Sequence, residues 1–318
     1  MRVLITGGFG YLGGRLAQFL ANQVGYQILL GSRRHAGPPP WLPQATLAQT
    51  QWNSPSGLAE NCSDVDAVVH LAGINAQECV ADPVAAFEIN AVATARLLQA
   101  AVRQGVRRFV YVSTAHVYGS PLTGVITEET CPVSLHPYAT SHRAGEDIVR
   151  AANHRGEIEG VVIRLSNSYG APTHKDINCW TLLVNDLCYQ AVTTQRMVLN
   201  SSGIQKRNFI TLTDACMAIK HLLDLSAHNL SDGLFNVGSG WTPTVLEMTQ
   251  YVAERIHAVT GQKPKILRNT RKDNESPSLL DFRITKLIGT GFNAAGNDNV
   301  DHEIDGLIQF CLRHFTQY

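Results

Sequence analysis

The sequence has no excess of charge of either sign and no long apolar run, and both absences exclude partners. Its 26 lysines and arginines balance 26 aspartates and glutamates, so a nucleic-acid backbone or an anionic membrane has no electrostatic hold on it. No apolar run approaches the roughly 20 residues of a membrane span, and the first residues lack the layout of a signal peptide. We therefore expect a cytoplasmic protein that binds neither nucleic acid nor membranes.

Cysteine pairs are also missing. The 7 cysteines are scattered, odd in number and never spaced as C-x-x-C, which argues against a disulfide framework and against a zinc site. We expect reduced, mostly packed thiols and no bound metal. The chain has no internal repeat, and the proline-rich stretch at residues 35–43 is short enough to be a stiff loop.

Short apolar runs alternate with stretches of helical periodicity along the first half of the chain. The periodicities predict strands and helices in strict alternation. The expected strands are residues 2–6, 26–31, 66–73, 108–114 and 160–166, and the expected helices are 11–24, 82–104, 137–154 and, near the end, 300–315. This order predicts an α/β, Rossmann-like fold with a doubly wound parallel sheet.

The alternation of expected strands and helices becomes irregular after about residue 166, which predicts a second domain. We expect a dinucleotide-binding domain over residues 1–165, with a returning segment near 209–238. Residues 166–318 should form mainly a smaller C-terminal substrate-binding lobe.

A glycine-rich turn joins the first strand to the first helix. In "TGGFGYLGG", Gly7, Gly10 and Gly13 are spaced three residues apart. Glycine at such places lets the backbone turn tightly and approach a pyrophosphate, whose charge then rests on the free N–H groups of the helix. The spacing predicts a dinucleotide site; the alternative is a turn whose glycines serve only close packing.

The end of the second expected strand lacks the acidic residue that NAD enzymes usually place against the adenosine ribose. Ser32, Arg33 and Arg34 stand there instead. Two guanidinium groups suit a 2′-phosphate, and no carboxylate is present to repel it. This favours NADP over NAD as the cofactor; the alternative is that both arginines point into water.

At this point the chain resembles the extended short-chain dehydrogenase/reductase family, which includes nucleotide-sugar epimerases, dehydratases and reductases. The likeness covers nearly the whole chain in nine segments that follow the family's order. They are "TGGFGYLGG", "VVHLAG", "FEINAVATARLLQAA", "FVYVSTAHVYG", "PYATSH", "VVIRLSNSYG", "GIQKRNFITLTD", "LFNVGSG" and "RKDNESPSLLDFRITKL".

The resemblance implies roles for individual residues. Tyr138 matches the catalytic tyrosine, which exchanges a proton with the reacting sugar oxygen while hydride moves to or from the nicotinamide. Thr114 takes the place of the residue that hydrogen-bonds that oxygen. Asn167, Arg207 and Arg271 match residues that hold the diphosphate of a nucleotide sugar, although Arg271 has the alternative of being an ordinary surface arginine.

The expected cofactor site is wider than the three glycines. It also includes residues of the glycine-rich turn and of the loop after the third strand, together with the catalytic pair of the helix at 137–154. These residues are Phe9, Tyr11, Leu12, Leu71, Ala72, Gly73, Tyr138 and His142.

The family has lysine where this chain has His142. Residues four apart share a helix face, so Tyr138 and His142 should point into one site, whereas Arg143 is rotated away. The family lysine binds the nicotinamide ribose and lowers the pKa of the tyrosine. Imidazole can do the first, but with an ordinary pKa of about 6.5 only about a tenth of it is charged at pH 7.5. Activation of Tyr138 as a base should therefore be weak.

This deficit favours reduction, because a tyrosine that starts protonated is the acid that reduction of a keto sugar needs. Dehydration and decarboxylation are disfavoured, because Ala115 and His116 replace the acidic residues that such family members carry. His116 either contacts the sugar or is a packed ring. The sequence thus predicts an NADP-dependent reductase that acts at C4 of a nucleotide-linked keto sugar. The resemblance also implies a homodimer, since many relatives pair through two helices.

Two alternatives stay open. One is an NAD-dependent nucleotide-sugar 4-epimerase, and the other is a catalytically silent NAD(P)-binding sensor or interaction protein.

Overall fold

A seven-stranded parallel sheet organises the chain, in the order β11-β7-β5-β4-β1-β2-β3. The computed structural model describes residues 1–33, 37–269, 278–293 and 297–316. Every neighbouring pair of strands in this sheet is parallel, so the expected Rossmann-like, doubly wound α/β fold is confirmed. The strands are β1 (Arg2–Thr6), β2 (Gln27–Ser32), β3 (Thr46–Gln49), β4 (Ala67–His70), β5 (Arg108–Thr114), β7 (Glu159–Leu165) and β11 (Leu234–Val237).

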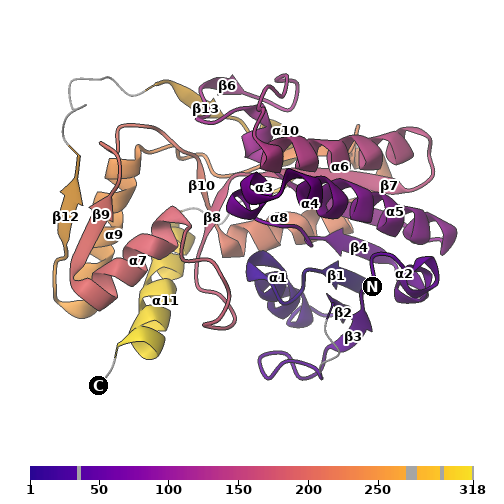
Figure 1. The fold of residues 1–318 in the computed structure, drawn as a ribbon, viewed down its shortest axis with the longest axis horizontal. Coiled ribbons are helices and arrows are strands. Elements are labelled where there is room, and N and C mark those ends of the chain that lie inside the picture. Colours follow the sequence, from indigo (N-terminus) through magenta and orange to yellow (C-terminus); the bar gives the residue numbers. More distant parts are fainter. Residues whose placement is uncertain (34–36, 270–277, 294–296, 317–318) are drawn as a thin grey trace.

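Alternating side chains of the strands supply two separate cores, one on each face of the sheet. On one face Val3 and Ile5 pack with α1 (Tyr11–Ala21) and α8 (Leu212–Asp224). On the other, Leu4 packs with α2 (Pro55–Cys62), α5 (Ala93–Arg103) and α6 (Pro137–His154). Figure 1 shows α5 and α6 along one side of the sheet and α1 on the other.

The helix at 137–154 has the bounds that the sequence predicts, whereas the expected helix at 82–104 is divided. It consists of α4 (Pro83–Phe87), a π-helical turn η1 (Glu88–Val92) and α5, preceded by an unexpected short helix, α3 (Ala76–Ala81). The expected strand at 66–73 ends at His70. Its pairing with β1 ends there, because Thr6, the partner of His70, is the last residue of β1.

The remaining elements form a second layer of structure beside the sheet (Figure 1). Around one further core lie α7 (Leu183–Thr194), β9 (Arg196–Leu199), α9 (Val245–Thr260), β12 (Lys265–Arg268) and α11 (Asn297–Phe315). Smaller elements are β6 (Gly124–Ile126) with β13 (Leu280–Phe282), β8 (Asn167–Tyr169) with β10 (Phe209–Thr211), α10 (Thr285–Gly289) and the 3₁₀ turns η2 (Ala115–Tyr118) and η3 (Ala227–Asn229).

Two polar contacts link this second layer to the glycine-rich turn and to α1, the helix that follows it. The hydroxyl of Tyr11 donates to the carbonyl of Gly170 at 2.9 Å, and Arg15 pairs with Glu303 at 2.8 Å. The predicted returning segment contributes β10, α8 and β11, of which β11 is an edge strand of the central sheet. The domain boundary at residue 165 stays a prediction.

Within the part of the chain that the structure describes, no helix combines the length and apolar character required to cross a membrane.

Candidate active site

The glycine-rich turn lies at the carboxyl end of β1 and has no room for side chains. The N–H of Gly10 donates to the carbonyl of Gly7 at 2.8 Å, and α1 begins at the next residue. A Cβ atom on Gly13 would lie 2.2 Å from the Gly7 oxygen, and Gly7 has a φ of +68°, which favours glycine. Bare backbone at a helix N-terminus can approach a pyrophosphate and stabilise its charge, so these residues fit a dinucleotide.

The side chains in this turn point away from the turn itself. The Tyr11 hydroxyl donates to Gly170, the Phe9 ring packs edge-on against Trp41 at 6.1 Å, and Leu12 packs against the core on the face that holds α1. These three side chains have partners within the protein, and the role of the three residues in cofactor binding stays a prediction.

The loop after β4 borders the glycine turn. A Cβ atom on Gly7 would lie 2.9 Å from the main-chain nitrogen of Ala72, and the N–H groups of Leu71 and Ala72 point to the Thr6 hydroxyl at 3.2 and 3.4 Å. This is where the sheet order reverses between β1 and β4, the crevice in which open α/β sheets bind ligands. Gly73 follows as an exposed residue of the same loop.

The residues predicted to select NADP lie at the end of β2. Ser32 is the last residue of that strand, and Arg33 follows it with an exposed side chain. Arg34 lies outside the described residues.

The three predicted catalytic residues lie together at the start of α6. The ring of Tyr138 meets that of His142 edge-on, with centroids 4.6 Å apart. Thr114, at the end of β5, lies close enough to Tyr138 for its hydroxyl to lower the pKa of the tyrosine. The first residues of α6 are oriented by its N-cap, since the ring of His136 accepts from the N–H of Tyr138 at 3.2 Å.

Burial sets the charge state of this site. It lowers the pKa of His142 to about 4, so the imidazole is neutral at physiological pH, and the expected tenth in the charged form is too high. Burial also raises the pKa of Tyr138, which the Thr114 hydroxyl offsets in part. Tyr138 therefore stands as a protonated phenol beside a neutral ring.

Arg207, one of the predicted substrate-binding residues, is a half-buried basic side chain. Burial lowers the pKa of Arg207, and no carboxylate among the described residues forms an ion pair with it. The pKa of His116 is lowered by burial and by the nearby charges of Arg207 and His136. Asn167, at the start of β8, donates from its side chain to the Asn208 carbonyl at 2.8 Å. An unpaired guanidinium suits an anionic ligand such as a diphosphate; Arg271 lies outside the described residues.

A buried ion pair that was not predicted from the sequence fixes the position of α6, the helix that carries Tyr138 and His142. Arg164 of β7 pairs with Glu146 of α6 at 2.6 Å, with side chains 3% and 0% exposed. The hydroxyl of Ser113 donates to the same carboxylate at 2.5 Å. The ion pair holds α6 against β7, and the Ser113 hydrogen bond holds it against β5, the strand that ends in Thr114. Its signal in the sequence was a charged residue, Glu146, four positions after His142 and so on the same helix face as the predicted catalytic residues.

The sheet, the bare glycine turn and the tyrosine-centred site define a dinucleotide-binding enzyme of the Rossmann type. Residues 3–238 match the NAD dependent epimerase/dehydratase family. The chain belongs to this family, and hence to the NAD(P)-dependent oxidoreductases and epimerases, which bears out the resemblance seen in the sequence.

Individual relatives span nearly the whole chain. The UDP-glucose 4-epimerase of Azospirillum brasilense is 30% identical over an alignment of 301 residues that covers 88% of this chain and 83% of that protein. MoeE5 in complex with UDP-glucose and NAD superposes with a TM-score of 0.80 at 23% identity, covering 99% of this chain and 100% of MoeE5. RMD from Pseudomonas aeruginosa, complexed with NADPH, gives a TM-score of 0.77 at 21% identity, covering 98% and 99%. These two structures show that the fold is shared.

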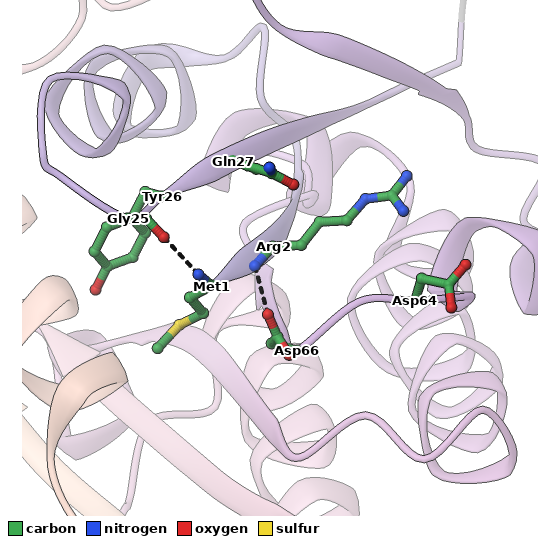
Figure 2. Close-up of a pocket in the computed structure, with 7 residues that line it drawn as sticks. All are labelled: Met1, Arg2, Gly25, Tyr26, Gln27, Asp64 and Asp66. Atoms are coloured by element: carbon green, nitrogen blue, oxygen red, sulfur yellow. Dashed lines mark hydrogen bonds between the residues drawn. The ribbon is translucent and has the colours of Figure 1, made fainter.

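A second hollow lies at the opposite end of the sheet, where β1, β2 and β4 begin. Figure 2 shows that its polar groups already bond one another: the Asp66 carboxylate accepts from the N–H of Arg2, and the amino group of Met1 donates to the Gly25 carbonyl. Ligands of open α/β sheets bind at the carboxyl ends of the strands. The end of the sheet that carries Gly7, Thr114 and Tyr138 is therefore the candidate active site.

Proposed function

We propose that this protein is an NADP-dependent reductase that acts on the carbonyl group of a nucleotide-linked keto sugar. The observation that carries the proposal is the protonated phenol of Tyr138 beside the neutral, buried ring of His142. Reduction of a carbonyl needs an acid at its oxygen, whereas oxidation of an alcohol needs a base. A tyrosine without a fixed positive charge beside it is suited to the first task.

The residues of the site divide the work of this reaction. A bound nicotinamide supplies the hydride. Thr114 donates a hydrogen bond to the carbonyl oxygen, and Tyr138 transfers its proton to that oxygen as negative charge develops there. His142 positions the cofactor ribose, and Arg207 neutralises part of the diphosphate charge of the substrate.

The choice of NADP rests on the residues after β2. MoeE5 was solved with NAD and RMD with NADPH, so proteins with similar folds hold either dinucleotide. In this chain Arg33 and Arg34 offer charge to a 2′-phosphate and no acidic residue stands there to repel it.

A nucleotide-sugar 4-epimerase is the second candidate, because the relative at 30% identity is a UDP-glucose 4-epimerase. An epimerase of this kind oxidises its sugar first and must keep its cofactor bound until the hydride returns. Tyr138 would then have to act as a base before it acts as an acid.

We also propose that two copies of the chain pair through α4, η1 and the adjoining α6. Val84 and Phe87 lie three residues apart on α4, Val92 lies on η1, and these apolar side chains are 69%, 42% and 41% exposed. Exposed apolar side chains that gather on one surface indicate an interface. Analytical ultracentrifugation should show a dimer that dissociates in Val84→Glu, and a wild-type monomer at micromolar concentration would contradict the pairing.

Measurements of turnover distinguish the reductase from the epimerase and from a silent binding protein. We expect the purified protein to oxidise added NADPH in the presence of a nucleotide-linked 4-keto sugar, and Tyr138→Phe to lose at least about 100-fold in kcat. Tyr26→Phe, the same change at a tyrosine bonded to Asp224 on the surface, is the matched control. Interconversion of C4 epimers with retained NAD and without added cofactor would establish the epimerase instead. Binding of dinucleotide with neither reaction would identify a silent binding protein.

A further inference from the structure

One main-chain carbonyl collects two hydrogen bonds beneath the active site. The carbonyl oxygen of Asn90, in the π-helical turn η1, accepts from the Tyr111 hydroxyl at 3.1 Å and from the Thr94 hydroxyl at 2.8 Å. All three residues are buried. Single π-helical turns inside α-helices widen the helix locally and often occur at functional sites.

The proton of Tyr111 determines the state of His142. The Tyr111 oxygen lies 2.9 Å from Nδ1 of His142, and a phenol has only one proton to donate. A carbonyl cannot donate, so the 3.1 Å contact with Asn90 is a hydrogen bond only if Tyr111 donates there. Nδ1 of His142 must then carry a proton and donate to Tyr111. The opposite assignment would leave two lone pairs facing each other in a buried place.

The same reasoning assigns the tautomer of a second buried histidine, His70. Because Thr94 donates to Asn90, it must accept from Nε2 of His70 at 2.9 Å. Nδ1 of His70 then accepts from the Thr6 hydroxyl at 2.6 Å. Two chains of hydrogen bonds thus converge on one carbonyl and set opposite tautomers in the two rings, which provides an internal comparison.

The other nitrogen of His142 faces the predicted cofactor loop. A Cβ atom on Gly73 would lie 3.7 Å from Cε1 and 3.8 Å from Nε2 of His142. In a neutral ring whose Nδ1 carries the proton, Nε2 presents a lone pair. This nitrogen can only accept a hydrogen bond, whereas a lysine at the same place can only donate.

We propose that Tyr111 and the Asn90 carbonyl are positioning groups that hold His142 as its Nδ1–H tautomer. In this state Nε2 accepts a hydrogen bond from a ribose hydroxyl of the bound dinucleotide. The inference rests on the proposed function only in that the dinucleotide occupies this site; it does not depend on the direction of the reaction.

Histidine-labelled protein tests the tautomer directly. Two-bond ¹H–¹⁵N correlation spectra of the full chain distinguish the Nδ1–H, Nε2–H and doubly protonated rings, and His142→Gln identifies the signals of His142 by their loss. We expect His142 as Nδ1–H and His70 as Nε2–H, both unchanged between pH 6 and 9. A charged or Nε2–H ring at position 142 overturns the proposal, and this measurement needs only the wild-type protein.

Two variants then separate the arms of the network. Tyr111→Phe removes the acceptor of Nδ1–H, so the Nε2–H form of His142 should grow, while Thr94→Val should alter His70 and leave the tautomer of His142 unchanged. An unaltered His142 in Tyr111→Phe would show that Tyr111 does not hold the ring.

Binding gives a second readout that requires no turnover. With whichever of NADPH and NADH the wild type binds more tightly, Tyr111→Phe should raise Kd roughly two- to tenfold, the range expected for one hydrogen bond. Tyr26→Phe should not change Kd. An unchanged Kd in Tyr111→Phe would overturn the proposed role of Nε2. Neither measurement follows catalysis. Absence of reductase activity would therefore contradict the proposed function but not the tautomer of His142, and a different tautomer would not contradict the proposed function.

Discussion

Replacing His142 with lysine places a fixed positive charge beside Tyr138. In the wild type burial lowers the pKa of the imidazole to about 4, so roughly one ring in three thousand carries a proton at pH 7.5. The ordinary pKa of lysine is about 10.4, far enough above neutrality for the ammonium group to remain charged at pH 7.5 after a moderate loss from burial.

The size of the effect follows from the spacing of the two side chains. The rings of Tyr138 and His142 are 4.6 Å apart between centroids. A unit charge about 5 Å from a phenolate, in an effective dielectric of about 20, stabilises it by about 3 kcal/mol. This corresponds to a fall of about two units in the pKa of Tyr138.

The two directions of the reaction should respond oppositely. Burial raises the pKa of Tyr138 above its ordinary value, about 10, so wild-type reduction should keep its rate from pH 6 to about pH 10. In His142→Lys this alkaline limit should move down by about two units. Oxidation at pH 7.5, which needs the phenolate, should accelerate by up to about 100-fold.

Initial rates in both directions between pH 6 and 10.5 test this reasoning. Arg143→Lys is the control, because it places the same residue one position along α6, where the side chain is exposed and bonded to Pro132. An alkaline limit that stays where it is in the wild type, together with an unchanged oxidation rate, would refute the electrostatic account of position 142.

Three further substitutions probe the turn, the cofactor choice and the buried ion pair. Gly13→Ala places a Cβ atom 2.2 Å from a backbone oxygen and should raise the Kd of NADPH by at least about tenfold, whereas Gly306→Ala, with open space around it, should leave Kd unchanged in the same titration. Arg33→Ala should raise the Kd of NADPH by about tenfold, the low end for loss of a hydrogen bond to a charged group, and leave the Kd of NADH unchanged. An equal increase in both Kd values would contradict a contact with the 2′-phosphate. Arg164→Ala leaves Glu146 buried without its partner and should lower the free energy of unfolding in urea by about 3–5 kcal/mol. Arg155→Ala, which breaks an exposed ion pair, is the matched control and should leave the free energy of unfolding nearly unchanged.

Local patterns in the sequence determined the elements that frame the site. The glycine spacing predicted the turn at the end of β1, and helical periodicity predicted α6 with its observed bounds. The interval of four residues predicted that Tyr138 and His142 share a face, as their ring contact shows. Each of these depends on residues within one or two turns of each other, so a single segment contains the necessary information.

The short strands β3 and β11 were not predicted, because each has only four residues and, unlike β4, neither lies within a longer apolar run. The division of the helix at 82–104 was also missed, because a π-helical turn changes the backbone hydrogen bonds without interrupting the apolar pattern.

Only the tertiary structure decided the charge and tautomer of the site. The pKa of His142 falls because distant segments bury it, and its proton is placed by Tyr111 of β5 and Asn90 of η1. The same holds for Arg164, whose partner lies on another element. Burial and pairing arise between segments far apart along the chain, and the free energy of a charge or a proton depends on that surrounding packing rather than on its neighbours in sequence.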